Sequence, residues 1–278
     1  MSVRWRDGDG GDGGGVAWEG VTARVGRCRL PRWDCTAGLV VGGEAALLVD
    51  AGSSLAEGAR LRADVARLLG GHAGPAGEAA HAGAGTGTGT GASGPRGVTH
   101  LALTHPHFDH VFGAPAFPEA EVFGAVGVDA AYTPRGRGEL RADAVRNGLA
   151  PQAAAGAAGC LVPPRHHVTG EWTLDLGGGT TVLLADVGPG HTAHDLAVLV
   201  PATPSSPGVV FCGDLVEESG EPQAGPDAVP ARWPAALDRL LGLGGEDAVY
   251  VPGHGALVDA RFVRAQRDAL ARRFGVSP

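Results

Sequence analysis

Histidine and aspartate side chains gather in one short stretch of this chain. His105, His107, Asp109 and His110 lie within six residues, in the sequence THPHFDH, directly after the apolar segment VTHLALT. In extended backbone, side chains two residues apart point to the same side, so the imidazoles of His105 and His107 can reach one cation. Asp109 and His110 follow a turn and can face a second cation. Three imidazoles beside a carboxylate would be costly to desolvate without a metal, so this stretch predicts a metal site.

Three further ligand-type residues follow later segments that resemble strands. His191 follows TTVLLA, Asp214 follows VVFC and His254 follows AVYV, and each of the three has a glycine beside it. Glycine allows the tight turns and the close backbone approach that a metal-binding loop needs. Imidazole and carboxylate ligands suit Zn²⁺ and also Fe or Mn, and the lack of thiolate ligands argues against a purely structural zinc site of the cysteine type.

In their order along the chain, five motifs closely resemble those of the metallo-β-lactamase superfamily. They are an early Asp50 in LLVDAG, the run His-x-His-x-Asp-His, a lone His after Pro-Gly, then Gly-Asp, and last Pro-Gly-His. The resemblance extends from residue 36 to about residue 258. It implies an α/β fold of the αββα sandwich type, in which two mixed β-sheets pack face to face, with helices on both outer sides and metals at one edge.

The resemblance also implies a role for each candidate ligand. It divides the ligands between two metals bridged by Asp214: His105, His107 and His191 on the first, and Asp109, His110 and His254 on the second. Asp50 would steady the ligand loops. Two dications that share a water lower its pKa to near neutrality and give a bridging hydroxide, while one of them polarises the substrate. Asp109 and Asp214 would thus act in catalysis, and the expected cofactors are two zinc ions, with iron or manganese as alternatives.

Departures from known members of this family narrow the expected reaction. True metallo-β-lactamases lack the bridging aspartate, which is present here as Asp214. Glyoxalase II carries a long helical domain after its last histidine, whereas 24 residues follow His254, and lactone-cleaving relatives have a tyrosine where this chain has Glu217. The expected substrate is a small-molecule ester, thioester or lactone-type compound. A mononuclear iron sulfur dioxygenase of the persulfide type and a glyoxalase II-like thioesterase remain alternatives; a non-catalytic metal-binding protein would need a ligand to be missing, and none is.

Two residues outside the ligand set are candidates for contact with substrate. His194 lies three residues past His191 in HTAHD, close to the first expected metal. Glu217 begins the acidic segment EESGEPQ, which follows Asp214 and is expected to run along the site. The acidity of this segment is expected to disfavour anionic substrates.

The segments between the motifs predict strands and helices that would position these residues. Residues 39–41 and 46–49 predict a hairpin, and residues 98–103 a buried strand that leads into the histidine cluster. Further strands are expected at 172–176, 181–185, 196–200, 209–212 and 248–251, and helices at 55–69, 129–149, 233–241 and 259–274. Residues 1–15 are expected to form a flexible tail, and residues 16–278 a single domain with a disordered Gly-rich insertion at about 70–97.

Composition excludes several classes of protein. The 278 residues are 44% apolar and 19% charged, which is typical of a globular protein. A net charge of −8 argues against a nucleic-acid partner, which needs a basic face. The sequence has no run of apolar residues long enough to span a membrane and no secretory signal. We expect a cytoplasmic protein that acts on a small molecule, and a homo-oligomer is possible. The thiols of Cys28 and Cys35 are expected to be free, although a disulfide between them stays open.

Overall fold

The structure is a computed structural model that describes residues 3, 5, 17–70 and 94–276. The flexible tail predicted at 1–15 and the disordered insertion predicted at about 70–97 lie mainly outside the described residues. In the described part of the chain, no helix combines the length and the apolar character needed to cross a bilayer.

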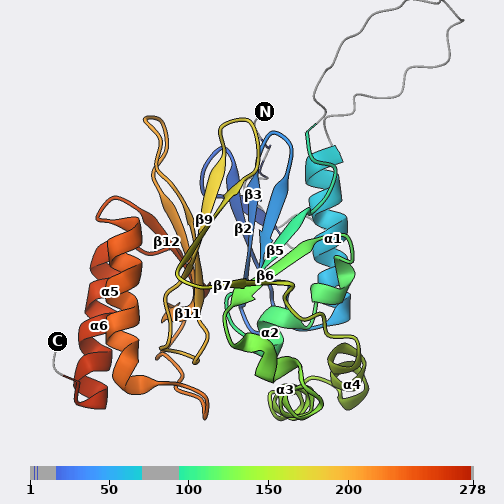
Figure 1. The fold of residues 1–278 in the computed structure, drawn as a ribbon, viewed down its shortest axis with the longest axis vertical. Coiled ribbons are helices and arrows are strands. Elements are labelled where there is room, and N and C mark those ends of the chain that lie inside the picture. Colours follow the sequence, from blue (N-terminus) through green and yellow to red (C-terminus); the bar gives the residue numbers. More distant parts are fainter. Residues whose placement is uncertain (1–2, 4, 6–16, 71–93, 277–278) are drawn as a thin grey trace, which may run out of the picture.

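Two β-sheets form the centre of the molecule (Figure 1). The larger sheet has seven strands in chain order: β1 (Trp18–Gly20), β2 (Val25–Arg29), β3 (Thr36–Val41), β4 (Ala46–Val49), β5 (His100–Ala102), β6 (Glu121–Ala125) and β7 (His166–Val168). The smaller sheet has five strands: β12 (Val249–His254), β11 (Val209–Glu217), β10 (Leu196–Val200), β9 (Thr181–Asp186) and β8 (Glu171–Asp175). Both sheets are mixed, because β4 to β7 run parallel and β11 runs parallel to β12, whereas the other neighbours are antiparallel.

Helices cover the two outer faces of this pair of sheets. The α-helices are α1 (Leu55–Gly70), α2 (Phe108–Val111), α3 (Pro134–Arg146), α4 (Pro151–Gly159), α5 (Trp233–Gly244) and α6 (Ala260–Phe274). Short 3-10 helices are η1 (Ala114–Ala116), η2 (Val128–Tyr132) and η3 (Pro230–Arg232). Helices α1 to α4 lie on the side of the larger sheet and α5 and α6 on the side of the smaller one (Figure 1). The predicted αββα sandwich is confirmed.

The core consists of three apolar layers, one at each interface of the sandwich. Along β4, Leu48 packs with residues of α1, while its neighbour Leu47 packs between the sheets. Along β11, Phe211 faces the other sheet and Val210 faces α5 and α6. Strands that are buried on both faces show continuous apolar runs, which explains why these strands were visible in the sequence.

Some elements differ from those predicted. The structure also contains β1, β2, β6, β7 and α4, which were not predicted. Strands β1 and β2 carry charged residues, and the alanine-rich α4 has no clear polar face. The helix predicted at 129–149 is interrupted at Thr133, whose hydroxyl accepts a hydrogen bond from the backbone N–H of Gly136 and so caps α3. The strand predicted at 209–212 continues to Glu217, so Asp214 lies within β11 and not in a loop after it.

Candidate metal centre

The seven ligand-type residues predicted from the sequence meet at one edge of the sandwich. They come from the turn between β5 and α2, from α2 itself, from the loop after β9, and from β11 and β12. The ligand atoms of six of them form two groups that share Asp214, and the atoms of each group lie within 4.8 Å of one another: His105, His107, His191 and Asp214 in the first, and His110, Asp214 and His254 in the second. The seventh residue, Asp109, forms a further group of this kind with His110 and the thiol of Cys35.

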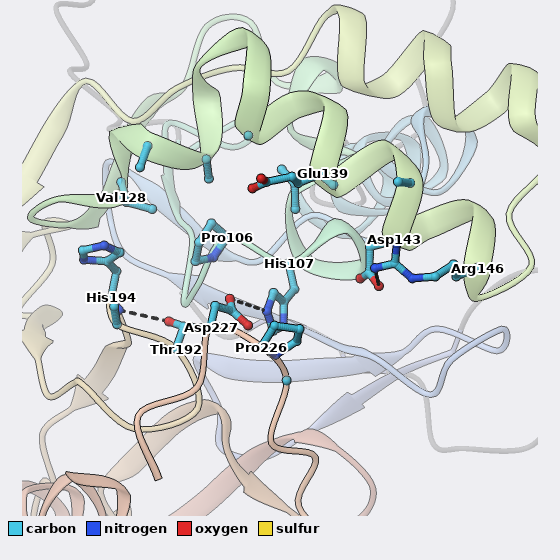
Figure 2. Close-up of a pocket in the computed structure, with 17 residues that line it drawn as sticks. Pro106, His107, Val128, Glu139, Asp143, Arg146, Thr192, His194, Pro226 and Asp227 are labelled. Carbon is cyan, nitrogen blue, oxygen red and sulfur yellow. Dashed lines mark hydrogen bonds and ion pairs between the residues drawn. The ribbon is translucent and has the colours of Figure 1, made fainter. Parts of the chain in front are cut away.

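A cavity of about 640 Å³ opens beside the first group (Figure 2). Its walls come from η2, from α3 and from the loops that follow β9 and β11, and His107 forms part of its lining. His194, a predicted substrate contact, also lines it, and its Nδ1 donates a hydrogen bond to the carbonyl oxygen of Val126 at 2.9 Å. Glu217 is not part of this lining; its carboxylate accepts a hydrogen bond from Ser219. The contact of Glu217 with substrate therefore stays a prediction.

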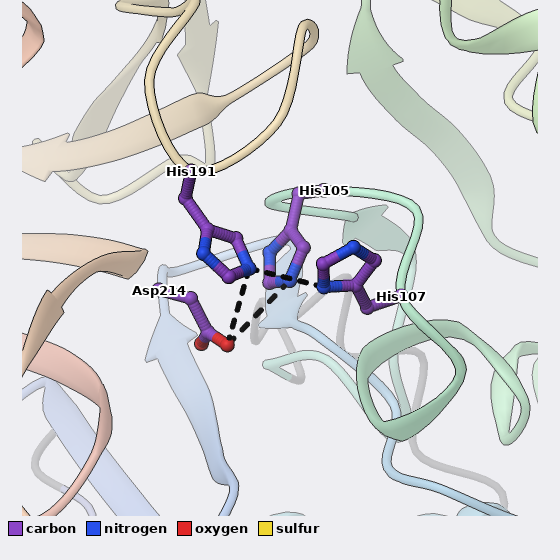
Figure 3. Close-up of side chains that lie close together, drawn as sticks. All are labelled: His105, His107, His191 and Asp214. Carbon is purple, nitrogen blue, oxygen red and sulfur yellow. Dashed lines mark hydrogen bonds and ion pairs between the residues drawn. The ribbon is translucent and has the colours of Figure 1, made fainter. Parts of the chain in front are cut away.

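The first group is a compact triangle of imidazoles with a carboxylate beneath it (Figure 3). The ring centres of His105, His107 and His191 are separated by 4.6, 4.7 and 4.8 Å. Nδ1 of His107 lies 3.0 Å from Nε2 of His191, and Oδ2 of Asp214 lies 3.5 Å from the same Nε2. Among the described residues, Nε2 of His105 is a buried polar atom with no hydrogen-bond partner. Three imidazole nitrogens and one carboxylate oxygen that converge in this way form a donor set that fits a metal ion.

The second group adjoins the first, with the ring centres of His105 and His110 4.2 Å apart. Oδ1 of Asp214 is 3.1 Å from Nε2 of His110, and its Oδ2 is 3.3 Å from Nε2 of His254. Oδ2 of Asp109 is 3.4 Å from the same Nε2 of His254. The Asp214 carboxylate therefore contacts histidines of both groups.

Backbone carbonyls orient two of these histidines. Nδ1 of His191 donates to the carbonyl oxygen of Gln223 at 3.1 Å, and Nδ1 of His254 donates to that of Trp33 at 2.7 Å. A carbonyl oxygen can only accept, so Nδ1 of each ring carries a proton, and in the neutral form of the ring the lone pair is on Nε2, which faces the cluster. The arrangement matches the way proteins orient metal-binding histidines.

Asp50 orients two more histidines from behind the cluster. Its Oδ2 accepts hydrogen bonds from Nδ1 of His110 and from the Thr104 hydroxyl, both at 2.8 Å, and its Oδ1 accepts from the Thr104 backbone N–H at 2.8 Å. The Thr104 oxygen in turn lies 3.0 Å from Nδ1 of His105. Asp50 thus contacts His110 directly and His105 through Thr104, and it does so with a φ of 58°, in the left-handed region that aspartate tolerates better than most residues.

Burial and neighbouring charges give His105, His191 and Asp214 of the first group the protonation states that bind a cation. Burial lowers the pKa of His105 well below its ordinary value and that of His191 to about 4, so both rings are neutral near pH 7. Burial opposes ionisation of Asp214, but the imidazoles of His254, His110 and His105 hold its pKa well below the ordinary range. Neutral imidazole and ionised carboxylate are the forms that bind metals.

Several residues of the site were not found from the sequence. Cys35 is buried next to the second group, where its Sγ lies 3.2 Å from the carbonyl oxygen of Asp109 and 3.8 Å from Nε2 of His110. Cys28 and Cys35 are both free thiols in the structure, so they do not pair. Thr104 directly precedes the histidine cluster and could have been suspected, whereas Cys35, Trp33 and Gln223 reach the site only through the fold.

Asp227 is another missed residue, and it supports the first group. Its Oδ2 accepts a hydrogen bond from Nε2 of His107 at 3.0 Å, which leaves Nδ1 of that ring for a cation (Figure 2). We expect Asp227→Ala to weaken metal binding at the first group about 10–100-fold, the usual effect of losing such a partner. Competition with a chelator of known affinity measures this change.

A matched control is available for that substitution. Asp129 accepts a hydrogen bond from Nε2 of His167 at the same distance of 3.0 Å, but neither residue belongs to the two ligand groups. Asp129→Ala should leave metal affinity unchanged. Equal affinity in the Asp227→Ala and Asp129→Ala proteins would contradict the role given to Asp227.

Helices α5 and α6 hold the part of β11 that carries Asp214. The register between β11 and β12 shifts around Gly213, and side chains bind the backbone beyond the shift. Nε2 of Gln266 donates to the carbonyl oxygen of Leu215 at 2.8 Å, and Oε1 of Gln266 accepts from the Glu217 N–H at 3.1 Å. The indole N–H of Trp233 donates to the same Leu215 oxygen at 3.0 Å.

Replacing Gln266 with glutamate should disturb this support. A carboxylate can still accept from Glu217, but it cannot donate to Leu215 and it adds a buried charge. We expect the free energy of unfolding to fall by about 1–3 kcal/mol and metal affinity at the second group to fall with it. Denaturant unfolding and metal titration measure both effects. Gln152→Glu on the exposed face of α4 adds the same charge and should change neither quantity, and equal behaviour of the two variants would refute the prediction.

Comparisons with known proteins agree with this geometry. The sequence model of the metallo-beta-lactamase superfamily matches residues 30–254. A hydroxyacylglutathione hydrolase from Cupriavidus metallidurans is 30% identical over 177 residues, which are 61% of this chain and only 55% of the length of that relative.

Solved structures with the same fold are more distant in sequence. A metallo-beta-lactamase from Pseudomonas aeruginosa in its mono-zinc form gives a TM-score of 0.64 at 18% identity, covering 95% of this chain and 97% of its own. A metallo-beta-lactamase from Pontibacter korlensis gives a TM-score of 0.61 at 19% identity, covering 92% of this chain and 98% of its own. At such low identity the likeness establishes the fold alone.

Proposed function

The chain belongs to the metallo-β-lactamase superfamily and is a metallo-hydrolase, and we propose that it uses two metals to hydrolyse a small-molecule ester, thioester or lactone-type substrate. The observation that carries this proposal is the position of Asp214, whose carboxylate lies between two groups of histidines. Zinc as the metal, a count of two, and a cytoplasmic location are parts of the proposal. The imidazole and carboxylate ligands would also suit iron or manganese.

In the proposed reaction, different residues hold the metals, orient the attacking water and contact the substrate. Two bound cations would activate a water molecule as the nucleophile and polarise the substrate carbonyl. Asp214 would hold both cations in place. Asp109, whose carboxylate contacts His254 of the second group, would orient the attacking water. His194 lines the cavity with its Nδ1 proton donated to Val126, so its Nε2 remains an acceptor for a donor group of the substrate.

A metal count combined with a substrate panel tests the proposal. Protein purified without added metal is analysed by mass spectrometry for bound metals, and it is assayed with ester, thioester, lactone and phosphodiester substrates. We expect about two metal equivalents and hydrolysis of at least one acyl substrate. A single iron with oxygen consumption would favour a sulfur dioxygenase instead, and metal-loaded protein that cleaves none of the acyl substrates would refute the proposal.

A second candidate is hydrolysis of glutathione thioesters, which the relative named hydroxyacylglutathione hydrolase favours. Comparing the kcat/KM for a hydroxyacylglutathione with the kcat/KM for a simple neutral thioester distinguishes this candidate from the first. A large preference for the glutathione conjugate would establish it.

A further inference from the structure

The cavity beside the first group is lined by both apolar and charged side chains (Figure 2). The apolar side chains are small or medium in size and come from η2 and α3, among them Val128, Ala131 and Leu140. The charged side chains are Glu139, Asp143 and Arg146 on α3 and Asp227 beside His107. A volume of about 640 Å³ is in the range of sites for small molecules.

The charged side chains of this lining are predominantly acidic. The guanidinium of Arg146 is already bound to Asp143, with Nη2 donating to Oδ1 at 2.9 Å. Glu139 accepts a hydrogen bond from Arg135, which lies outside the lining, and Asp227 accepts one from His107. Three carboxylates therefore line the cavity with one guanidinium, and that guanidinium is paired.

The consequence for a ligand follows from charge. A carboxylate on a bound molecule would lie among like charges and would find no unpaired arginine in the lining. Like charges brought together across a binding surface cost affinity and act as a filter against the wrong partner. An uncharged chain, in contrast, can bury its surface against Val128, Ala131 and Leu140 at no electrostatic cost.

We propose that this cavity receives the acyl part of the substrate, and that it selects acyl groups whose far end is uncharged over those that end in a carboxylate. The proposal rests on the function proposed above, because it places the reacting carbonyl at the ligand groups next to His107. The selecting residues are Asp143 and Glu139, and Asp143 also keeps Arg146 from serving as an anion site.

A pair of thiols of equal shape tests the selectivity without a reaction. In 3-mercaptopropionate and 3-methyl-1-butanethiol the thiol can bind the metals of the holoprotein, and the tails have the same size but differ in charge. Calorimetry on the metal-loaded protein should give an affinity at least about tenfold higher for the uncharged thiol, and this ratio should shrink as salt is added. Equal affinities, or tighter binding of the carboxylate, would overturn the proposal.

Substitutions on α3 tell whether the named residues cause the selectivity. Asp143→Asn removes one carboxylate and frees Arg146, so we expect the affinity ratio of the two thiols to fall to about threefold or less. Glu119→Gln removes an exposed carboxylate that is bound to Arg62 and does not line the cavity, and it should leave the ratio unchanged. A ratio that stays the same in Asp143→Asn would overturn the assignment.

Hydrolysis of matched esters separates this proposal from the broader one. p-Nitrophenyl butyrate and p-nitrophenyl monosuccinate have acyl chains of the same length, but only the succinyl chain ends in a carboxylate. We expect the butyrate ester to have a kcat/KM about tenfold higher or more. Equal kcat/KM values would overturn the selectivity but would leave the metallo-hydrolase proposal intact. Failure of the metal-loaded protein to cleave any acyl substrate would overturn the proposed function, while the thiol pair would still decide the selectivity.

Discussion

Replacing Asp214 with asparagine is expected to leave about one bound metal equivalent and to lower kcat on the order of 10³-fold. The Asp214 carboxylate reaches both ligand groups, with Oδ2 3.5 Å from Nε2 of His191 in the first group and Oδ1 3.1 Å from Nε2 of His110 in the second. Asparagine has the same shape, but it is neutral and presents an NH₂ donor where one of the two acceptor oxygens stood. It can therefore serve one cation and cannot bridge two.

Metal analysis and steady-state kinetics on the same preparation measure this effect. Asp64 is a buried aspartate on α1 that belongs to neither ligand group, so Asp64→Asn provides the matched control and should keep both metals. Circular dichroism of both variants shows whether the fold is retained. An Asp214→Asn protein that keeps two metals and the full rate would exclude the bridging role.

Gly253→Ala should be almost as damaging, although it adds only a methyl group. A Cβ atom at this position would lie 1.9 Å from Oδ1 of Asp214 and 2.9 Å from the carbonyl carbon of Gly213. Gly213 is backbone paired with Pro252 across β11 and β12, so it cannot move away cheaply and the carboxylate must move instead. We expect metal affinity at the second group to fall about 10–100-fold and the free energy of unfolding to fall by about 1–3 kcal/mol.

A glycine on the surface of α5 supplies the control for this substitution. A Cβ on Gly242 would meet nothing within 4 Å, so Gly242→Ala should keep both metals and raise stability by up to about 1 kcal/mol through helix propensity. Metal titration and denaturant unfolding compare the two variants directly. Should Gly253→Ala bind two metals with unchanged affinity, glycine would not be required at this position.

The sequence alone predicted the set of ligands, because it depends on local motifs, and it predicted the sandwich through the family resemblance that these motifs carry. Strands such as β4 and β10 are short apolar runs, and α6 shows a regular apolar spacing that ends at Phe274. The ligands stand out because four of them lie within six residues and the other three each directly follow a glycine, and the structure brings all seven together. Elements with weak patterns, such as α4 and β1, were not visible by the same criteria.

The tertiary structure decided how each ligand is oriented and what surrounds it. Asp227, Trp33 and Gln223 orient ligand histidines from positions far away in the chain, and no local pattern marks such residues. The placement of Asp214 inside β11 depends on the shift of register against β12, and the acidic cavity depends on where α3 packs. Residue type and spacing determine which side chains can bind a metal, because those are local chemical properties. The direction of a ring, the partner of its second nitrogen and the charge of the adjoining cavity follow from long-range packing, which only the folded chain contains.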